Sequence, residues 1–313
     1  MDNKQFGFVM DAMSIIRPEK DGTIALIEAA QNQGIQSWVM HLNDLMIENG
    51  EPYARMSNIQ LHLGSDPWYE FTEERYAPLT ELSVIMMRKD PPVDLAYIYA
   101  TQILELAEEA GVKVFNRPQA LRDYNEKLMI AKFPECIADT LVTADRQKIQ
   151  MFFDTHQDVI VKPLDGMGGS SVYRLQDLAE KSQAIIDEMT RSGQKYIMLQ
   201  QFLPAVFEGD KRIFLVNGEP IEKAVLRVPA KGNVRANLAA GGTAKVVPLT
   251  KRDDWLCEQI SPTLKKAGLF FVGLDVIGDY ITEINVTCPT CLRELYAGSG
   301  IDLAQIIINQ IIN

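Results

Sequence analysis

Two distant stretches of the chain carry residue types that can bind metal ions and phosphate groups. Asp275, Glu283 and Asn285 lie in a largely apolar stretch that we expect to form a β-hairpin. Carboxylate and amide oxygens are the ligands that hard ions such as Mg²⁺ prefer. Far upstream, Lys162 precedes the glycine-rich stretch 166–171, whose backbone N–H groups can approach phosphate oxygens closely. Together the two stretches predict a protein that binds a nucleoside triphosphate and uses it to form a bond.

The hairpin makes a specific prediction about strand register. Glu283 and Asn285 are two residues apart and share one face of their strand. A two-residue turn at 278–279 would pair Asp275 with Thr282 and place Glu283 on the opposite face. A three-residue loop would pair Asp275 with Glu283. A shared metal site therefore predicts the longer loop or a β-bulge. The alternative, carboxylates that face solvent, is disfavoured by the apolar neighbours.

The glycine-rich stretch is a candidate phosphate-binding loop. It is not a P-loop, because no Gly-Lys-Ser/Thr sequence follows the glycines. A plain glycine-rich turn between two strands is the alternative. Phosphate binding is favoured because a lysine at the end of a buried strand is costly unless an anion meets it. The residues expected to contact phosphate are Lys162, Gly166, Gly168, Gly169 and Ser170.

Residues 229–242 are small and glycine-rich, which is typical of a mobile lid that excludes water from a site. Arg212, Arg227 and Arg235 lie close to or within this stretch and could hold phosphate or carboxylate groups through bidentate hydrogen bonds. Taken singly, each arginine could equally be a surface residue. The histidines lie outside every motif, so histidine general-base and Ser-His-Asp chemistry find no support. They are His41, His62 and His156.

Composition bounds the class of protein. The 313 residues suffice for about two domains, and 47% hydrophobic with 23% charged residues is typical of a globular protein. The net charge of −11, without a basic run, argues against a nucleic-acid partner. No apolar run approaches the roughly 20 residues that cross a bilayer, and the N-terminus lacks a signal-peptide pattern. We therefore expect a cytoplasmic protein that acts on small molecules and not on a membrane.

The four cysteines are too few and too scattered for a secreted disulfide framework. Cys288 and Cys291 form a C-x-x-C sequence, but no second pair or nearby histidine completes a zinc site. Ordinary reduced thiols are favoured, and a redox or metal role is the alternative.

The pattern of apolar residues predicts alternating strands and helices in the first part of the chain and mostly strands from residue 158 onward. Alternation of this kind is typical of a parallel sheet with crossover helices. The expected strands of the first part are 6–10, 37–40, 82–87 and 112–115, and the expected helices are 23–33, 95–110 and 120–131. The later elements are strands 159–162 and 196–202, a strand 212–216 that turns at Asn217-Gly218, a helix 255–267, the hairpin 270–286 and an amphipathic helix 301–312.

At these motifs the chain resembles the ATP-grasp ligases, and within them the bacterial glutathione synthetases. The resemblance covers nearly the whole chain. It rests on the segments Val9–Asp11, Met87–Pro92, Asn116–Pro118, Asn125–Lys127, Lys162–Gly169, Gly209–Arg212, Arg235–Gly242, Phe271–Asp275 and Glu283–Thr287. It implies an α/β (α+β) fold in which an N-terminal parallel-sheet domain, residues 1–124, precedes a two-subdomain ATP-grasp fold, residues 125–203 and 204–313.

The resemblance also implies roles for individual residues. Lys127 and Lys162 would contact ATP phosphates from two subdomains, and Asp210 would lie near the ribose. The adenine cleft would be lined by Gln200, Gln201, Phe202 and Leu203. The ligands of two Mg²⁺ ions, or of Mn²⁺, would be Asp275, Glu283 and Asn285. The residues that steady the acyl phosphate and the lid would be Arg212, Arg227 and Arg235. The dipeptide subsite would contain Arg88, Asn285, Cys288, Thr290 and Glu294.

The reaction implied by the resemblance is ligation of γ-glutamylcysteine with glycine through an acyl phosphate, with ATP as co-substrate, in a homotetramer. One alternative is another ATP-grasp ligase, such as a D-alanine–D-alanine or glutamate-adding enzyme. Another is a non-catalytic, synapsin-like ATP-binding module. Cys288 departs from the family pattern of serine at this position, so a hydroxyl hydrogen bond is lost and an oxidisable thiol takes its place.

Overall fold

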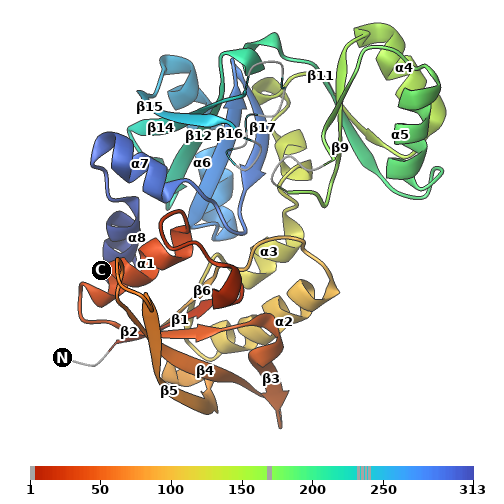
Figure 1. The fold of residues 1–313 in the computed structure, drawn as a ribbon. Helices are drawn as coiled ribbons and strands as arrows, with labels where there is room; N and C mark the ends of the chain where they lie inside the picture. Colours follow the sequence, from red (N-terminus) through yellow and green to blue (C-terminus); the bar gives the residue numbers. More distant parts are fainter. Residues whose placement is uncertain (1–3, 168–170, 231–232, 234–235, 237, 239–240) are drawn as a thin grey trace.

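The computed structural model describes residues 4–167, 171–230, 233, 236, 238 and 241–313. In this part of the chain the strands form three β-sheets, which follow one another along the sequence (Figure 1). Together with their helices they give the mixed α/β fold that the sequence predicts. Gly168, Gly169, Ser170 and Arg235 lie outside the described residues, as do several other residues of the expected lid. Within the described part, every helix is too short or too polar to cross a membrane.

The first sheet has seven strands in the order β3-β4-β2-β1-β6-β7, with β5 paired to β4. As predicted, its centre is parallel: β1 pairs with β2 and β6, and β6 with β7. The antiparallel strands β3, β4 and β5 are not predicted, since β5 is mostly exposed and polar and gives little apolar signal. The elements are β1 Gln5–Val9, α1 Gly22–Gln31, β2 Gln36–Met40, β3 Leu45–Glu48, β4 Glu51–Leu61, β5 Tyr69–Pro78, β6 Val84–Met87, α2 Leu95–Glu109, β7 Lys113–Phe115 and α3 Pro118–Asp123.

The helix expected at 120–131 is wrong, because the chain leaves the helical conformation at its centre. The Asn125 side-chain oxygen accepts a hydrogen bond from the Lys127 N–H (3.0 Å), which competes with the helical pattern. The chain resumes as a short 3₁₀ helix, η4 Leu128–Lys132. As a result Glu126 and Lys127 lie against the third sheet, where the Glu126 carbonyl accepts from an N–H of its last strand.

The second sheet is antiparallel, with strand order β10-β9-β11-β8, and helices α4 and α5 pack on it; neither helix is predicted. The third sheet has the antiparallel order β15-β14-β12-β16-β17, with β13 paired to β12. Asn217 and Gly218 form the predicted turn with φ of 50° and 73°. The elements are β8 Thr140–Thr143, α4 Arg146–His156, β9 Val159–Pro163, β10 Tyr173–Leu175, α5 Glu180–Thr190, β11 Ile197–Gln201, β12 Asp210–Val216, β13 Glu219–Pro220, β14 Lys223–Val228, β15 Thr243–Pro248, α6 Lys251–Ala267, β16 Phe271–Ile277, β17 Tyr280–Asn285, α7 Leu292–Ser299 and α8 Leu303–Ile312.

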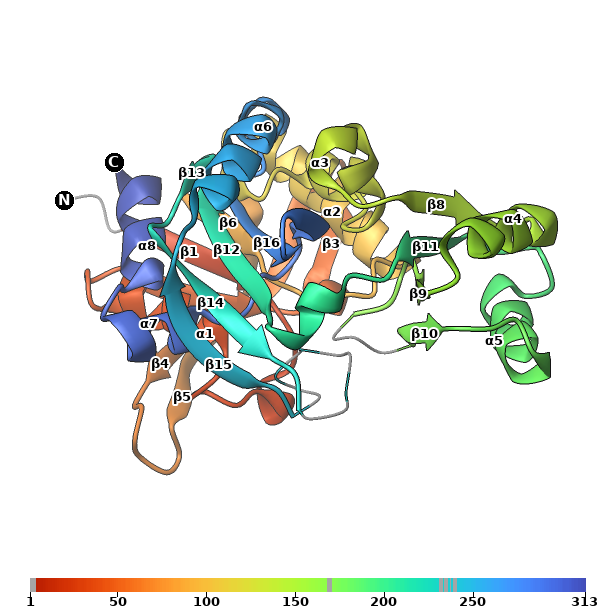
Figure 2. The same ribbon diagram turned by 90° about the horizontal axis from the view of Figure 1, so that it is seen from above.

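The first and third sheets share their hydrophobic cores, and we call them, with their helices, the main body. Shared cores contain Trp38, Leu104, Leu256 and Leu274 in one cluster and Phe6, Ile24, Phe214 and Ile307 in another. The second sheet with α4 and α5, residues 140–201, has a core of its own and is called the small body. It projects from the main body in both views (Figures 1 and 2).

Candidate active site

The β16–β17 hairpin places two of the predicted metal ligands opposite each other. Its turn contains only residues 278–279, so Val276 pairs with Ile281. A bulge between Asp275 and Val276 then shifts the register by one residue and pairs Asp275 with Glu283. The sequence predicts either a longer loop or a β-bulge, and the structure confirms the bulge. The two carboxylates lie on one face of the hairpin.

Two arginines hold the Asp275 carboxylate, which is only 4% exposed. Arg212 donates two hydrogen bonds to it, Nε to Oδ1 at 2.6 Å and Nη2 to Oδ2 at 3.1 Å. Arg227 lies 3.0 Å from the same Oδ1 and also donates to Asp210 at 2.6 Å. Burial opposes ionisation of Asp275, but the two guanidinium groups outweigh it and hold its pKa well below the usual range. Burial raises the pKa of Asp210 to about 7 despite Arg227.

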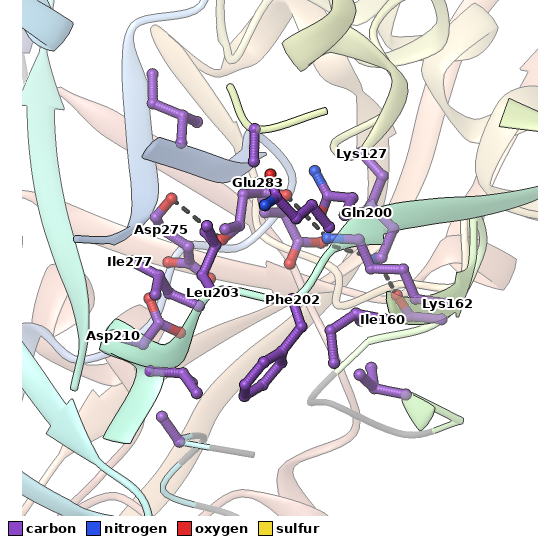
Figure 3. A pocket seen from close by; sticks show the side chains of 18 of the residues that line it. Lys127, Ile160, Lys162, Gln200, Phe202, Leu203, Asp210, Asp275, Ile277 and Glu283 are labelled. Atoms are coloured by element: carbon purple, nitrogen blue, oxygen red, sulfur yellow. Dashed lines mark hydrogen bonds and ion pairs between the residues drawn. The ribbon is translucent and has the colours of Figure 1, made fainter. Parts of the chain in front are cut away.

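Two lysines from different parts of the fold converge on the hairpin (Figure 3). Lys127, at the break after α3, donates to Glu283 Oε1 (2.8 Å) and to the Gly166 carbonyl (2.6 Å). Lys162, at the end of β9, donates to the Thr282 carbonyl (3.0 Å). Burial lowers the pKa of Lys162 to about 8, although Glu283 opposes the shift. A cation that is costly to bury in this way is suited to receive an anionic ligand.

A pocket opens between these lysines and β11 (Figure 3). The four residues expected in the adenine cleft line it where β11 ends: Gln200, Gln201, Phe202 and Leu203. Gln200 is held by a hydrogen bond to the Thr140 hydroxyl (3.0 Å). The charged residues Lys127, Lys162, Asp210, Asp275 and Glu283 also line this pocket. Other walls are apolar: Ala138, Ile160, Val172, Val206, Ile277 and Ile281. Apolar walls with charges at one end suit a flat base and a phosphate chain.

A second pocket of about 580 Å³ adjoins the first. The two share Met167, Asp275 and Glu283 in their walls, so a group between them would face both. Of the residues expected to bind the dipeptide or steady an acyl phosphate, the second pocket contains Arg212, Arg227, Asn285, Cys288, Thr290 and Glu294. It also contains Arg17, Lys20 and Asp90, which sequence reasoning missed. The structure therefore brings most of the predicted site residues to two connected cavities.

Arg88 is not brought to the lining of this pocket. Its side chain is 3% exposed and donates to the Pro289 carbonyl (3.0 Å) and the Thr23 hydroxyl (3.3 Å). It therefore supports the segment that carries Cys288. Cys288 and Cys291 are both free thiols whose pKa burial raises, so neither is predisposed to form a thiolate.

Glu126 is a site residue that sequence reasoning missed. Its Oε1 accepts three hydrogen bonds, from the N–H groups of Val286 (2.8 Å) and Thr287 (3.0 Å) and from the Thr287 hydroxyl (2.8 Å). Burial, and next the nearby Glu283, raise the pKa of its carboxyl above the usual range. The only signal in the sequence is that Glu126 directly precedes Lys127.

Several solved structures share this architecture, and some of them are described as ATP-grasp proteins. The D-cycloserine synthetase DcsG superimposes with a TM-score of 0.70 at 14% sequence identity, over 98% of both chains. A RimK domain protein of ATP-grasp type from Sphaerobacter thermophilus gives 0.65 at 16% identity, over 99% of this chain and 100% of the other. The chain therefore has the ATP-grasp fold.

Sequence comparison narrows this class. Residues 5–122 match the N-terminal domain of prokaryotic glutathione synthetase and residues 126–300 match its ATP-grasp domain. The glutathione synthetase of Vibrio parahaemolyticus is 48% identical over 299 residues, covering 96% of this chain and 95% of that protein. That of Escherichia coli O127:H6 is 45% identical over 307 residues, covering 98% and 97%. The chain belongs to the prokaryotic glutathione synthetase family.

Proposed function

We propose that the protein joins γ-glutamylcysteine to glycine through an acyl phosphate formed from ATP, giving glutathione, ADP and phosphate. The observation that carries this proposal is the meeting of two pockets at Asp275 and Glu283. One pocket has the shape and charge for a nucleotide. The other pocket is polar and large enough for a charged dipeptide. Membership of the glutathione synthetase family indicates which substrate each pocket would bind.

ATP would lie in the first pocket with its base against the end of β11. Lys127 and Lys162 are aimed at the hairpin from the two sides of this pocket, so they would bind the β- and γ-phosphates. Phosphate would displace the lysine contacts to Gly166 and Thr282, which are to neutral carbonyls. Gly168, Gly169 and Ser170 are proposed to complete the phosphate contacts.

The donor atoms of the hairpin fit a divalent metal ion. Asp275 and Glu283 supply carboxylates, and Asn285, whose Nδ2 donates to the Gly273 carbonyl (3.2 Å), has its Oδ1 left as a third oxygen donor. No cluster of three His, Cys, Asp or Glu side chains occurs among the described residues, so the amide oxygen of Asn285 would be the third protein donor here. We therefore assign Mg²⁺, or Mn²⁺, to Asp275, Glu283 and Asn285. Such an ion would neutralise phosphate charge and orient the γ-phosphate.

The first chemical step would transfer the γ-phosphate to the cysteinyl carboxylate of the dipeptide. Arg212 and Arg227 face the second pocket at this point, and their guanidinium groups would stabilise the charge of the acyl phosphate, with Arg235 of the lid. Glycine's amine would then attack the acyl carbon and displace phosphate. The side chains of Cys288, Thr290 and Glu294 would hold the dipeptide, with Arg88 supporting them from behind.

The division of the chain into residues 1–124, 125–203 and 204–313 remains part of the proposal. Its support is that each sheet lies within one of these ranges. A homotetramer and a cytoplasmic location stay predictions.

The test is ATP-dependent phosphate release with γ-glutamylcysteine, with and without glycine, beside a D-alanine control. Release that needs both γ-glutamylcysteine and glycine, with a tripeptide product of glutathione mass, is the expected result. Release with D-alanine alone would move the protein to another ligase activity. Tight ATP binding without release under any condition would overturn the catalytic proposal.

A further inference from the structure

The second pocket contains five carboxylates, and they differ in their partners. Asp275 and Glu283 form ion pairs with arginine and lysine. Asp90, Glu126 and Glu294 have no ion pair among the described residues. A carboxylate without a cation beside it is available to a positively charged or proton-bearing group of a substrate.

Of these three, Glu126 is adjacent in sequence to Lys127, which lines the first pocket. It precedes Lys127, whose Nζ binds Glu283, and the Glu283 charge is the strongest electrostatic influence on Glu126. Glu126 also lines a further pocket of about 250 Å³, together with Thr287 and Tyr124. Its side chain is therefore accessible to a small amine in either of these pockets.

The two carboxylate oxygens of Glu126 differ in their hydrogen bonds. Oε1 is occupied by three donors from Val286 and Thr287, which fixes the orientation of the group. Oε2 has no hydrogen bond within the described structure. The neighbouring Tyr97 hydroxyl is fully buried and likewise has no hydrogen-bond partner in the described part of the chain. Its pKa is raised, first by burial and next by the charge of Glu126. The charged group that most affects the Glu126 carboxyl is thus Glu283, and the Tyr97 hydroxyl lies close by.

The second chemical step needs a proton acceptor at this place. Glycine is an ammonium ion at neutral pH and is nucleophilic only as the free amine. General-base removal of a proton by a positioned side chain contributes about 100- to 10,000-fold to a rate. Asp275 is unsuited, because Arg212 and Arg227 already occupy its carboxylate oxygens. Glu126 lines the pocket with Oε1 fixed by three donors and Oε2 without a hydrogen bond in the described structure, so one oxygen is available to accept a proton.

We propose that Glu126 is the catalytic base that activates the incoming amine. The inference rests on the ligase function proposed above. Glu126 Oε2 takes one proton from the glycine ammonium. The amine nitrogen then forms a bond to the acyl carbon, and the carbon–oxygen bond to phosphate breaks with its electron pair on the phosphate. The leaving phosphate takes the second proton from nitrogen, which leaves the amide N–H, and Glu126 returns its proton to solvent.

The test compares two amines in the variant Glu126→Gln. The glutamine amide oxygen still accepts from Val286 and Thr287, so the fold of the segment is retained. Hydroxylamine is largely unprotonated at neutral pH and needs no base, and its product is a hydroxamate. We expect kcat with saturating glycine to fall by about 100-fold or more. The rate with hydroxylamine should stay within about threefold of the wild type.

Two further variants serve as controls. Asp123→Asn makes the same charge change on an exposed side chain three residues away and should leave both rates unchanged. Glu294→Gln lies in the same pocket and should slow both amines alike through weaker dipeptide binding. Unfolding midpoints of all variants establish that they are folded.

Each other outcome overturns the proposal. Equal losses with glycine and hydroxylamine would make Glu126 a structural residue. A higher KM for glycine with kcat unchanged would make it an ammonium-binding residue. An unchanged glycine rate would place the base elsewhere. If wild-type protein forms neither tripeptide nor hydroxamate, it is the ligase function that fails, and that result is distinct from all three.

Discussion

The main body and the small body are built differently around the same nucleotide pocket. In the main body the first and third sheets share two hydrophobic cores, so they pack as one unit. The small body has a separate core of eight buried residues. Met198 of β11 belongs to a main-body core, and the small-body residues Val142 and Leu164 pack against that core. Polar ties between the bodies include Lys162 to Thr282 and Asn125 to Leu164.

This difference bears on how the two pockets work. The second pocket is lined almost wholly by the main body and is therefore held by a large apolar interface. The nucleotide pocket lies between the bodies, and its two lysines come from opposite sides. Polar ties are easily exchanged for phosphate contacts, whereas a shared core is not. We expect dipeptide recognition to be largely preformed and nucleotide binding to depend on the relative position of the bodies.

The largest effect is expected from a substitution in the main body, at the wall that the two pockets share. Asp275→Asn removes a proposed metal ligand and the counter-charge of Arg212 and Arg227. Ligase activity should fall at least about 1,000-fold. The free energy of unfolding should fall by about 3 kcal/mol, because two buried guanidinium groups lose their shared partner. Phosphate release and chemical denaturation measure these effects.

Asp279→Asn, at the exposed tip of the same hairpin, is the matched control and should behave as wild type. Near-normal activity of Asp275→Asn would show that Asp275 is neither a metal ligand nor required for catalysis.

From the small-body side, Lys162→Met should weaken ATP binding about 100-fold without changing the affinity for γ-glutamylcysteine, since Lys162 does not line the second pocket. Its free energy of unfolding should stay the same or rise, because a buried charge is removed. Titration calorimetry and denaturation check both expectations. Lys181→Met, exposed on α5, is the control. Loss of stability in Lys162→Met would identify this lysine as a structural group.

A core substitution tests the independence of the bodies. Ile149→Ala in α4 should destabilise the small body by about 2–4 kcal/mol and accelerate amide hydrogen exchange within residues 140–201 only. ATP affinity should fall several-fold. Leu264→Ala in α6 should instead accelerate exchange across the first and third sheets together. If Ile149→Ala accelerates exchange equally in both bodies, the two do not unfold separately.

The smallest expected effect is the uptake of a proton by Lys162 when ATP binds. With a pKa of about 8, Lys162 is mostly neutral at pH 9 in the free protein. Bound phosphate favours the charged form and raises this pKa, so ATP binding should take up close to one proton at pH 9. ATP affinity should therefore fall as pH rises through 8. Calorimetry in buffers of different ionisation enthalpy measures the uptake, and Lys162→Met should abolish it.

Much of the site could be predicted because its signals are local. Lys162 and the glycines after it are adjacent in sequence, and Asn217-Gly218 forms the expected turn. The bulge at Asp275 was predictable for a different reason: the side-chain period of a strand allows only a few registers, and a shared site selects among them.

Other features depend on contacts between distant segments. The break in the helix expected at 120–131 brings Glu126 and Lys127 to β17, some 160 residues later in the chain. The family resemblance implies that Arg88 contacts the dipeptide, whereas its buried side chain donates to the Pro289 carbonyl. Strands β3 to β5 are not predicted from the sequence. They are stabilised by pairing with β2 and with one another, and a polar strand has no apolar pattern that would indicate such pairing.

Local patterns in the sequence indicate the class of chemistry and many of the residues that line the two pockets, because glycine conformation, ligand type and strand period act over a few residues. The folded arrangement sets which charged groups face which pocket, and which carboxylates have no ion pair among the described residues. Those properties depend on burial and on partners far away in the chain, and the free energy of a charged group is set by that surrounding rather than by its neighbours in sequence.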